Sequence, residues 1–180
     1  VDAAQADLAA QLAKTDLVTD MVGEFPELQG TMGRYYALND GLPEAVADAI
    51  EDHYKPRFAG DSLPRGEVGV VVALADKLET LVGMFGIGNL PTGDKDPFAL
   101  RRHALGVIRI LVEKAPQLSL ADVLAHVQAS FAGRIPAQTE FSDVTASLSQ
   151  FLYERLAGSL REQGYSAQVI AAVLALQPQR

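Results

Sequence analysis

The chain has 180 residues, of which 48% are hydrophobic, so it is long enough to bury a core of its own. Its formal net charge of -8 argues against binding nucleic acid over the whole surface, because such binding requires cations that neutralise phosphates. The absence of cysteine excludes disulfides and thiolate metal sites. No apolar run has the length of a membrane span and the first residues do not form a signal peptide, so a soluble, cytoplasmic protein is expected.

The elements predicted along the chain are all helices. Apolar side chains recur at helical spacing, and no segment alternates between apolar and polar residues as a half-buried strand does. The sequence therefore predicts an all-α fold. Helices are expected at residues 2–25, 27–38, 43–54, 66–85, 97–114, 119–132, 142–163 and 166–177.

Several boundaries have a local cause. Asp96 followed by Pro97 predicts a helix start, with the aspartate as N-cap and the proline at the first helical position. Ser119 and Ser142 are further N-cap candidates, and Gly164 is typical of the residue that ends a helix. Residues 1–115 are expected to form one helical domain, and residues 116–180 a helical appendage packed on it, possibly as one continuous domain.

Charge is unevenly distributed along the chain. Residues 1–30 carry one basic residue against six acidic ones, whereas residues 91–115 carry five basic residues against three acidic ones. An RNA-facing surface, if the chain has one, is therefore expected in its middle.

Two arginines of the helix predicted at 97–114 form a candidate RNA contact. Arg102 and Arg109 are seven residues apart, so they lie on one edge of the helix, roughly 10 Å apart along its axis. Guanidinium groups at that spacing could contact two phosphates of one strand. A solvated helix edge explains the same pattern, and both interpretations stay open. Further candidates for tRNA contact are Lys95, Arg57 and Arg65.

Arg101 differs from these two arginines because it points into the apolar side of the predicted helix. A buried guanidinium needs a partner, and Asp76, Glu79 and Asp96 are the candidates.

Several long ungapped stretches resemble one protein family, the β subunit of the bacterial two-subunit glycyl-tRNA synthetase. In the middle of the chain they are ALADKLETLVG, GIGNLPTGDKDPFALRR and LGVIRIL. Upstream are LAKTDLVTDMVGEFPELQGTMGRYYA and AIEDHYKPRFAGDSLP, and downstream are FLYERLAGSLREQGY and VIAAVLAL, in the family's order. The resemblance covers essentially the whole chain and is more specific than a single short motif.

The resemblance implies that the chain is an internal fragment of a ligase subunit that serves ATP-dependent attachment of glycine to tRNA(Gly). The family assigns the reacting groups, with ATP and Mg²⁺, to the separate α subunit, so no catalytic or cofactor-binding residue is expected in this fragment. Its implied partners are the α subunit, the remaining β-subunit domains and tRNA(Gly), with no DNA and no membrane. The segment is expected to position tRNA and to scaffold the assembly.

A more distant resemblance is to phosphohydrolases of the His-Asp (HD) superfamily, in which histidines and aspartates of a helical bundle hold metal ions. On that resemblance Asp16, His53 and Asp76 keep side chains that can bind a metal. The histidine expected beside Asp16 is replaced by Thr15, with Lys14 next to it, and a protonated lysine repels a divalent cation. The resemblance therefore implies a degenerate HD domain without metal.

A structural role is the competing interpretation for each of the three residues: capping or pairing with Lys14 for Asp16, a backbone hydrogen bond for His53, and a charged partner for Asp76. Two alternative functions remain open from the sequence. One is a surviving metal-dependent HD phosphohydrolase, and the other is a purely structural module for protein contacts.

Overall fold

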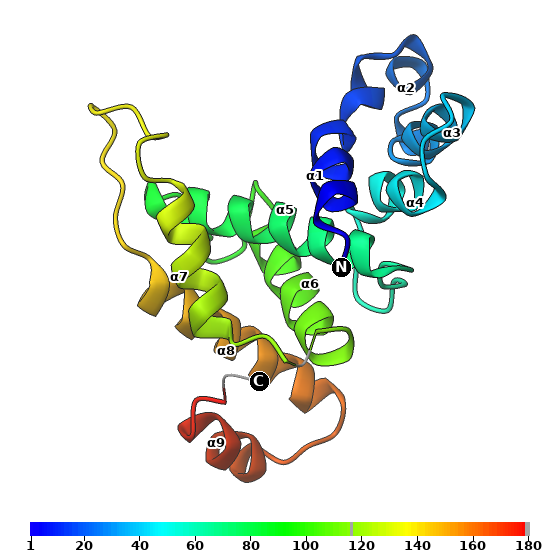
Figure 1. The fold of residues 1–180 in the computed structure, drawn as a ribbon. Coiled ribbons are helices and arrows are strands. Elements are labelled where there is room, and N and C mark those ends of the chain that lie inside the picture. The colour runs from blue at the N-terminus through cyan, green and yellow to red at the C-terminus, as the bar shows by residue number, and fades with distance from the viewer. Residues whose placement is uncertain (116, 179–180) are drawn as a thin grey trace. The chain divides into compact units, whose positions relative to one another are not determined.

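The computed structural model describes residues 1–115 and 117–178, and within them all regular secondary structure is helical (Figure 1). The only β-type pairing among these residues is an isolated bridge between Thr92 and Lys95. The prediction of an all-α fold is therefore confirmed. The α-helices are α1 (Ala3–Leu12), α2 (Asp20–Glu24), α3 (Thr31–Asn39), α4 (Glu44–Asp52), α5 (Glu67–Gly86), α6 (Leu100–Glu113), α7 (Leu120–Ser130), α8 (Thr145–Glu162) and α9 (Ala167–Ala175), with short 3-10 helices η1 (Thr15–Val18) and η2 (Pro26–Leu28).

The chain divides into two compact units, Val1–Asp76 and Lys77–Arg180, and α5 begins in the first and ends in the second. The domain boundary predicted near residue 115 lies inside the second unit. The resemblance to an HD domain stays a prediction.

The first unit is built around α4, which packs against α1 and α3. Alanine is frequent where these helices meet, and such small side chains let helix backbones approach closely. Ile50 fills the centre of this core, and Val68 and Val72 add the start of α5 to it.

The second unit is organised on α8, which packs against α6, α7 and α9. Leu148 and Leu152 of α8 are buried, as are Val107 and Ile110 of α6. The ring of Phe151 lies 5.2 Å from that of Phe85, measured between centroids. None of the helices among the described residues is long and apolar enough to cross a membrane.

The helix predicted at 2–25 is wrong, because the structure breaks it into α1, η1 and α2. The Thr15 hydroxyl donates to the Leu12 carbonyl, and Thr19 serves as the N-cap of α2. Between them Asp16 turns inward to meet the backbone of α3. This distant contact competes with the local helical pattern and prevails over it.

The start predicted for the helix at 97–114 is three residues too early. Ala99 has a left-handed backbone conformation, with φ 54°, and α6 begins only at Leu100. Asp96 nevertheless caps the helix: its carboxylate accepts from the amides of Leu100 at 2.8 Å and Arg101 at 2.9 Å. The N-cap position predicted for Asp96 is therefore occupied by Ala99, and Asp96 accepts from the first helical amides from three residues before it.

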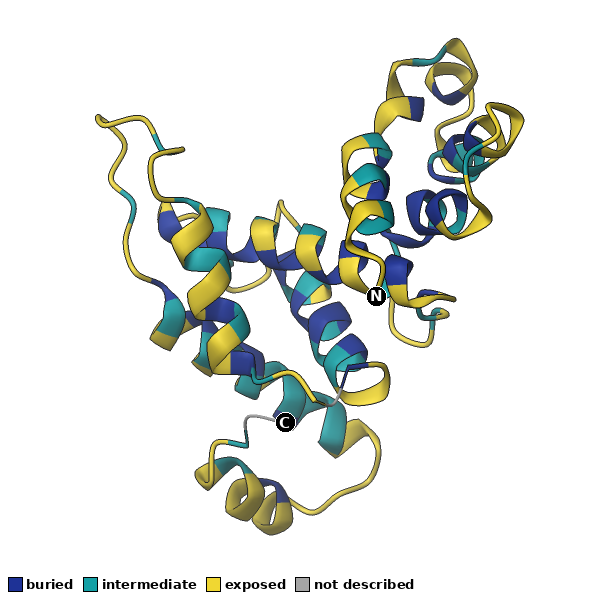
Figure 2. Cartoon of the chain, viewed as in Figure 1, coloured by how far each residue is buried: buried dark blue, intermediate teal, exposed yellow. Residues whose placement is uncertain are grey.

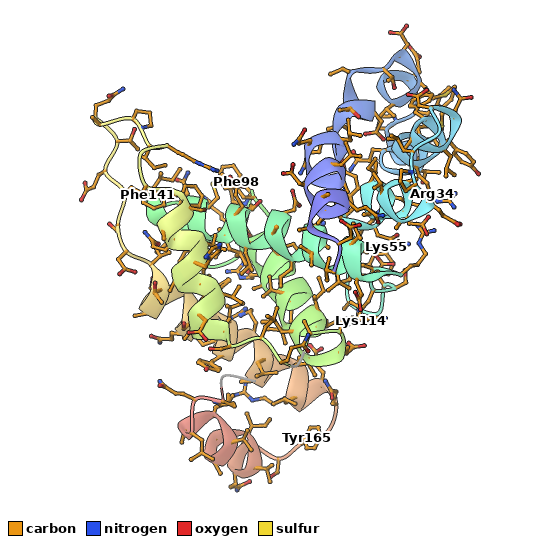
Figure 3. All side chains as sticks on the ribbon, in the orientation of Figure 1. Arg34, Lys55, Phe98, Lys114, Phe141 and Tyr165 are labelled. Carbon is orange, nitrogen blue, oxygen red and sulfur yellow. The ribbon has the colours of Figure 1, made fainter. Side chains whose placement is uncertain are left out.

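Two aromatic rings of the loop after α7 pack on the end of α5. Phe141, labelled in Figure 3, stacks on Phe131 with ring centroids 5.0 Å apart. The Ser142 amide donates to the Gly86 carbonyl at 3.0 Å. A Cβ atom on Gly86 would lie 2.1 Å from a ring carbon of Phe141, so only glycine fits this position.

We expect Gly86→Ala to lower the free energy of unfolding by about 1–3 kcal/mol, because the added Cβ atom displaces the Phe141 ring from its packed position. The measurement is denaturant unfolding followed by circular dichroism. Gly158→Ala in α8 is the matched control, since nothing lies within 4 Å of its added Cβ. It should stabilise the protein by about 0.5–1 kcal/mol, and an equal response of the two variants would contradict the packing argument.

Candidate functional site

Asp16 is buried in η1 and caps a distant helix. Its Oδ2 accepts from the amide of Gly30 at 2.6 Å and from that of Gly33 at 3.1 Å, at the start of α3. Gly30 is the N-cap residue of α3 and has φ 81°. The Asp16 side chain therefore satisfies amides that the helix itself leaves without a partner. This matches the capping role that was one structural interpretation of Asp16.

His53 is fully buried at the end of α4. Its Nδ1 donates to the Ile50 carbonyl at 2.7 Å, which places a proton on that nitrogen. The imidazole lies against the ring of Tyr54, with centroids 3.8 Å apart. The backbone hydrogen bond is the structural role that was open for this histidine.

Asp76 forms an ion pair with Lys14, which satisfies the need for a charged partner. Tyr54 lies near both aspartates of this region. Burial raises the pKa of Tyr54 to about 12, and the negative charges of Asp16 and Asp76 add to the increase, against a smaller lowering by Arg57. The phenol therefore stays protonated at neutral pH.

The three positions that match the HD resemblance are engaged in other contacts. Asp16 uses one oxygen to cap a helix, His53 uses one nitrogen on a carbonyl, and Asp76 faces an ammonium group. Across residues 1–115 and 117–178, no three or more His, Cys, Asp and Glu side chains form a group that could hold a metal ion. Several converging donors are needed for such a site.

An ion cluster on α4 engages one of the predicted tRNA contacts. Asp52 is fully buried, and Arg65 donates to it from its backbone amide at 2.7 Å, from Nε at 2.9 Å and from Nη2 at 2.8 Å. Lys55 lies 2.9 Å from the same carboxylate, and Arg65 also contacts Glu51 at 2.5 Å. Arg65 is therefore held by carboxylates of its own unit.

The cluster continues through Arg34, which donates to Asp48 at 2.6 Å. Arg34 comes from α3 and Lys55 from the loop after α4, and Figure 3 labels both. The three carboxylates carry as much formal charge as the three cations, so the cluster joins α3, α4 and the following loop without net charge. We missed it in the sequence, where Asp48, Glu51 and Asp52 at helical spacing were the available signal.

The ion pairs of the cluster shift the pKa values of its members in opposite directions. Burial raises the pKa of Asp52, but hydrogen bonds from Arg65 and the charge of Lys55 outweigh burial and leave it below its ordinary value. The carboxylate of Asp52 raises the pKa of Arg65 above its ordinary value despite burial. Both side chains are therefore held in their charged forms.

The candidate RNA contacts of the second unit lie on and before α6. Arg102 and Lys95 are exposed, while Arg109 is half-buried and donates to Glu113 at 3.0 Å. Arg102 and Arg109 share one helix, as predicted. The Arg101 guanidinium donates to the Gly93 carbonyl at 2.5 Å, so the carboxylate partner predicted for its side chain is replaced by a backbone oxygen.

The five candidate tRNA contacts are divided between the units. Arg57 belongs to the first unit with Arg65: its backbone amide donates to Asp61 at 2.7 Å, and its guanidinium lies 5.7 Å from the centre of the Tyr54 ring. Lys95, Arg102 and Arg109 belong to the second unit.

Comparison with known proteins identifies the family. The family model described as "Glycyl-tRNA synthetase beta subunit" matches residues 1–175. Proteins named "Glycine--tRNA ligase beta subunit" are 75% identical over 178 residues in Delftia acidovorans and 76% identical over 178 residues in Paracidovorax citrulli. In both, the alignment covers 99% of this chain and 24% of the relative.

A third relative with the same name, from Janthinobacterium sp., is 68% identical over 180 residues, which is 100% of this chain and 25% of the relative. The chain thus spans about a quarter of the length of the curated relatives that it matches. The match runs through both units and through every helix of the structure. The chain belongs to the glycyl-tRNA synthetase beta subunit family.

Proposed function

We propose that the chain positions tRNA and scaffolds the assembly in an enzyme that attaches glycine to tRNA(Gly) with ATP. Membership of the family over residues 1–175 carries this proposal. In this proposal the α subunit carries the reacting groups and binds ATP and Mg²⁺, and this chain holds no cofactor. The partners are that α subunit, the remaining β-subunit domains and tRNA(Gly).

The edge of α6 formed by Arg102 and Arg109 is the RNA contact in this proposal, with Lys95 extending it. Arg102 is exposed, and the capping of α6 by Asp96 fixes the helix that carries both arginines. Arg109 is held by Glu113 on the same helix, which orients its guanidinium. A fixed cation loses less conformational freedom when it meets a phosphate.

The metal-dependent phosphohydrolase is not favoured, because the side chains that would bind its metal are engaged in capping, backbone and ion-pair contacts. The structural module without RNA contact is an outcome of the test that follows.

Reversing both charges with Arg102→Glu and Arg109→Glu is expected to weaken tRNA binding and its salt dependence. The assay is tRNA binding, over a range of salt concentrations, to the synthetase assembled with a full-length β subunit that carries this segment. Losing two phosphate contacts should reduce the slope of log affinity against log salt by about 1.4–1.8.

Arg134→Glu with Arg161→Glu is the matched control, because both are exposed arginines of the same unit and the change in net charge is equal. If the control pair alters affinity and slope as much as the α6 pair, the effect is one of total charge and the α6 contact is wrong. Unchanged binding in both pairs would support a purely structural module.

A further inference from the structure

The helix α9 is apolar around its circumference but largely exposed (Figure 2). Gln168 is its only polar residue, and Ile170 is its only buried one. Val169 is 51% exposed and Val173 is 45% exposed, and Leu176 at the C-cap is 82% exposed. Their spacing of four and three residues places the three on one face of the helix. A helix that is apolar on all sides is ordinarily covered by protein.

A groove of about 1010 Å³ runs between α8 and α9, within the second unit. Its α8 wall repeats every three or four residues, so it is one face of that helix, about 18 Å long. Leu174 and Gln177 form the opposite wall. The lining residues of α8 and of the segment just before it are Asp143, Thr145, Ala146, Ser149, Gln150, Tyr153, Glu154 and Ala157.

The groove is acidic. Asp143 and Glu154 line it, and no Lys or Arg is among its lining residues. Hydrogen bonds from Thr145 lower the pKa of Asp143, so this carboxylate is ionised at neutral pH. Arg155, the cation beside Glu154 at 3.8 Å, lies over the ring of Phe151. These carboxylates would repel phosphates, which favours a cationic occupant over RNA.

We propose that the α8–α9 groove binds a basic amphipathic helix of a protein. Its apolar side chains pack on Leu174 and on the alanines of α8, and its lysines or arginines face Asp143 and Glu154. The α8 wall is long enough for one helix to lie along it, and the small side chains Ala146 and Ala157 allow the helix backbone to come close. This contact goes beyond the tRNA contact proposed for α6 and does not depend on it.

The test uses the 180-residue chain and a fluorescein-labelled helical peptide of about 18 residues made of leucine and lysine. A second peptide carries glutamate in place of lysine. Binding is measured by fluorescence anisotropy. The lysine peptide should bind, and the glutamate peptide should bind at least about tenfold more weakly.

Three variants locate the contact. The double variant Asp143→Lys with Glu154→Lys should weaken binding of the lysine peptide by about tenfold. The control variant Asp7→Lys with Asp94→Lys makes an equal change in charge at exposed positions elsewhere, and it should weaken binding by less than about twofold. Ala146→Trp blocks the groove without changing charge and should also weaken binding of the lysine peptide by about tenfold. Circular dichroism checks that each variant folds.

Equal losses in the two charge variants, or full binding to Ala146→Trp, would overturn the proposal. So would failure of the lysine peptide to bind. A polyuridine oligonucleotide that competes with the lysine peptide on wild type, and no longer binds Ala146→Trp, would show that the groove binds RNA. That result would also contradict the proposal.

Discussion

Asp52→Ala is expected to lower the free energy of unfolding by about 3 kcal/mol. The carboxylate is fully buried and receives three hydrogen bonds from Arg65 and an ion pair from Lys55. Removing the carboxylate leaves the Arg65 and Lys55 cations without the partner that they share. The loss stays near the lower end of the range for a broken buried pair, because the Arg65 side chain is 42% exposed and can rehydrate. Denaturant unfolding at neutral pH measures it.

Two comparisons test this explanation. Asp48→Ala removes a carboxylate of the same helix that is 23% exposed, and it should cost clearly less than Asp52→Ala. The folded-state pKa of Asp52 is lowered, so its contribution is fully present above the unfolded value of about 3.9 and is lost as the pH falls through the folded value. The gap between wild type and Asp52→Ala should therefore narrow below about pH 4, and a gap that is constant with pH would contradict the charged role.

Asp16→Ala is expected to cost about 2–4 kcal/mol, because two buried amides at the start of α3 lose their acceptor. Asp16→Asn keeps an oxygen that can accept from Gly30 and Gly33, so it should cost less than the alanine variant. Denaturant unfolding of both variants gives the comparison.

Asp20→Ala is the control for this prediction, since Asp20 is an exposed aspartate in the first turn of α2. It should cost no more than about 1 kcal/mol. An Asp16→Ala variant as stable as Asp20→Ala would show that Asp16 does not hold α3. Stabilisation of wild type by manganese that is absent in Asp16→Ala would instead support a metal role for this residue.

Most of the fold could be predicted from local sequence signals. The predicted 66–85 helix matches α5 to within one residue at each end, and Ser119 caps α7 while Gly164 follows α8 in a left-handed conformation. The late start of α6 has a local cause, the left-handed conformation of Ala99. Other errors lie where distant contacts decide the backbone: Ser142 does not cap α8, which begins at Thr145, and its amide donates to the Gly86 carbonyl. Asp16 breaks the first predicted helix because its partners, Gly30 and Gly33, are far along the chain and cannot be inferred from periodicity.

The candidate site was less predictable than the fold. Residue type could show that Arg102 and Arg109 share a helix edge, but not that Arg65 is held by Asp52 and Glu51. Arg65 lies in a loop, and tertiary packing determines which carboxylates come close enough to pair with it. The α8–α9 groove was also missed, because a groove is a property of two helices and not of either sequence.

The proposal that the α subunit carries the reacting groups and this chain positions tRNA is tested most directly by assaying the two steps of the ligase reaction separately. The Arg102→Glu and Arg109→Glu enzyme, assembled with its α subunit, is assayed for glycine-dependent ATP–pyrophosphate exchange and for charging of tRNA(Gly). We predict unchanged exchange, and an increase of the KM for tRNA of about tenfold or more with little change in kcat. Loss of exchange together with charging would contradict the account, as would tRNA charging that is indistinguishable from wild type.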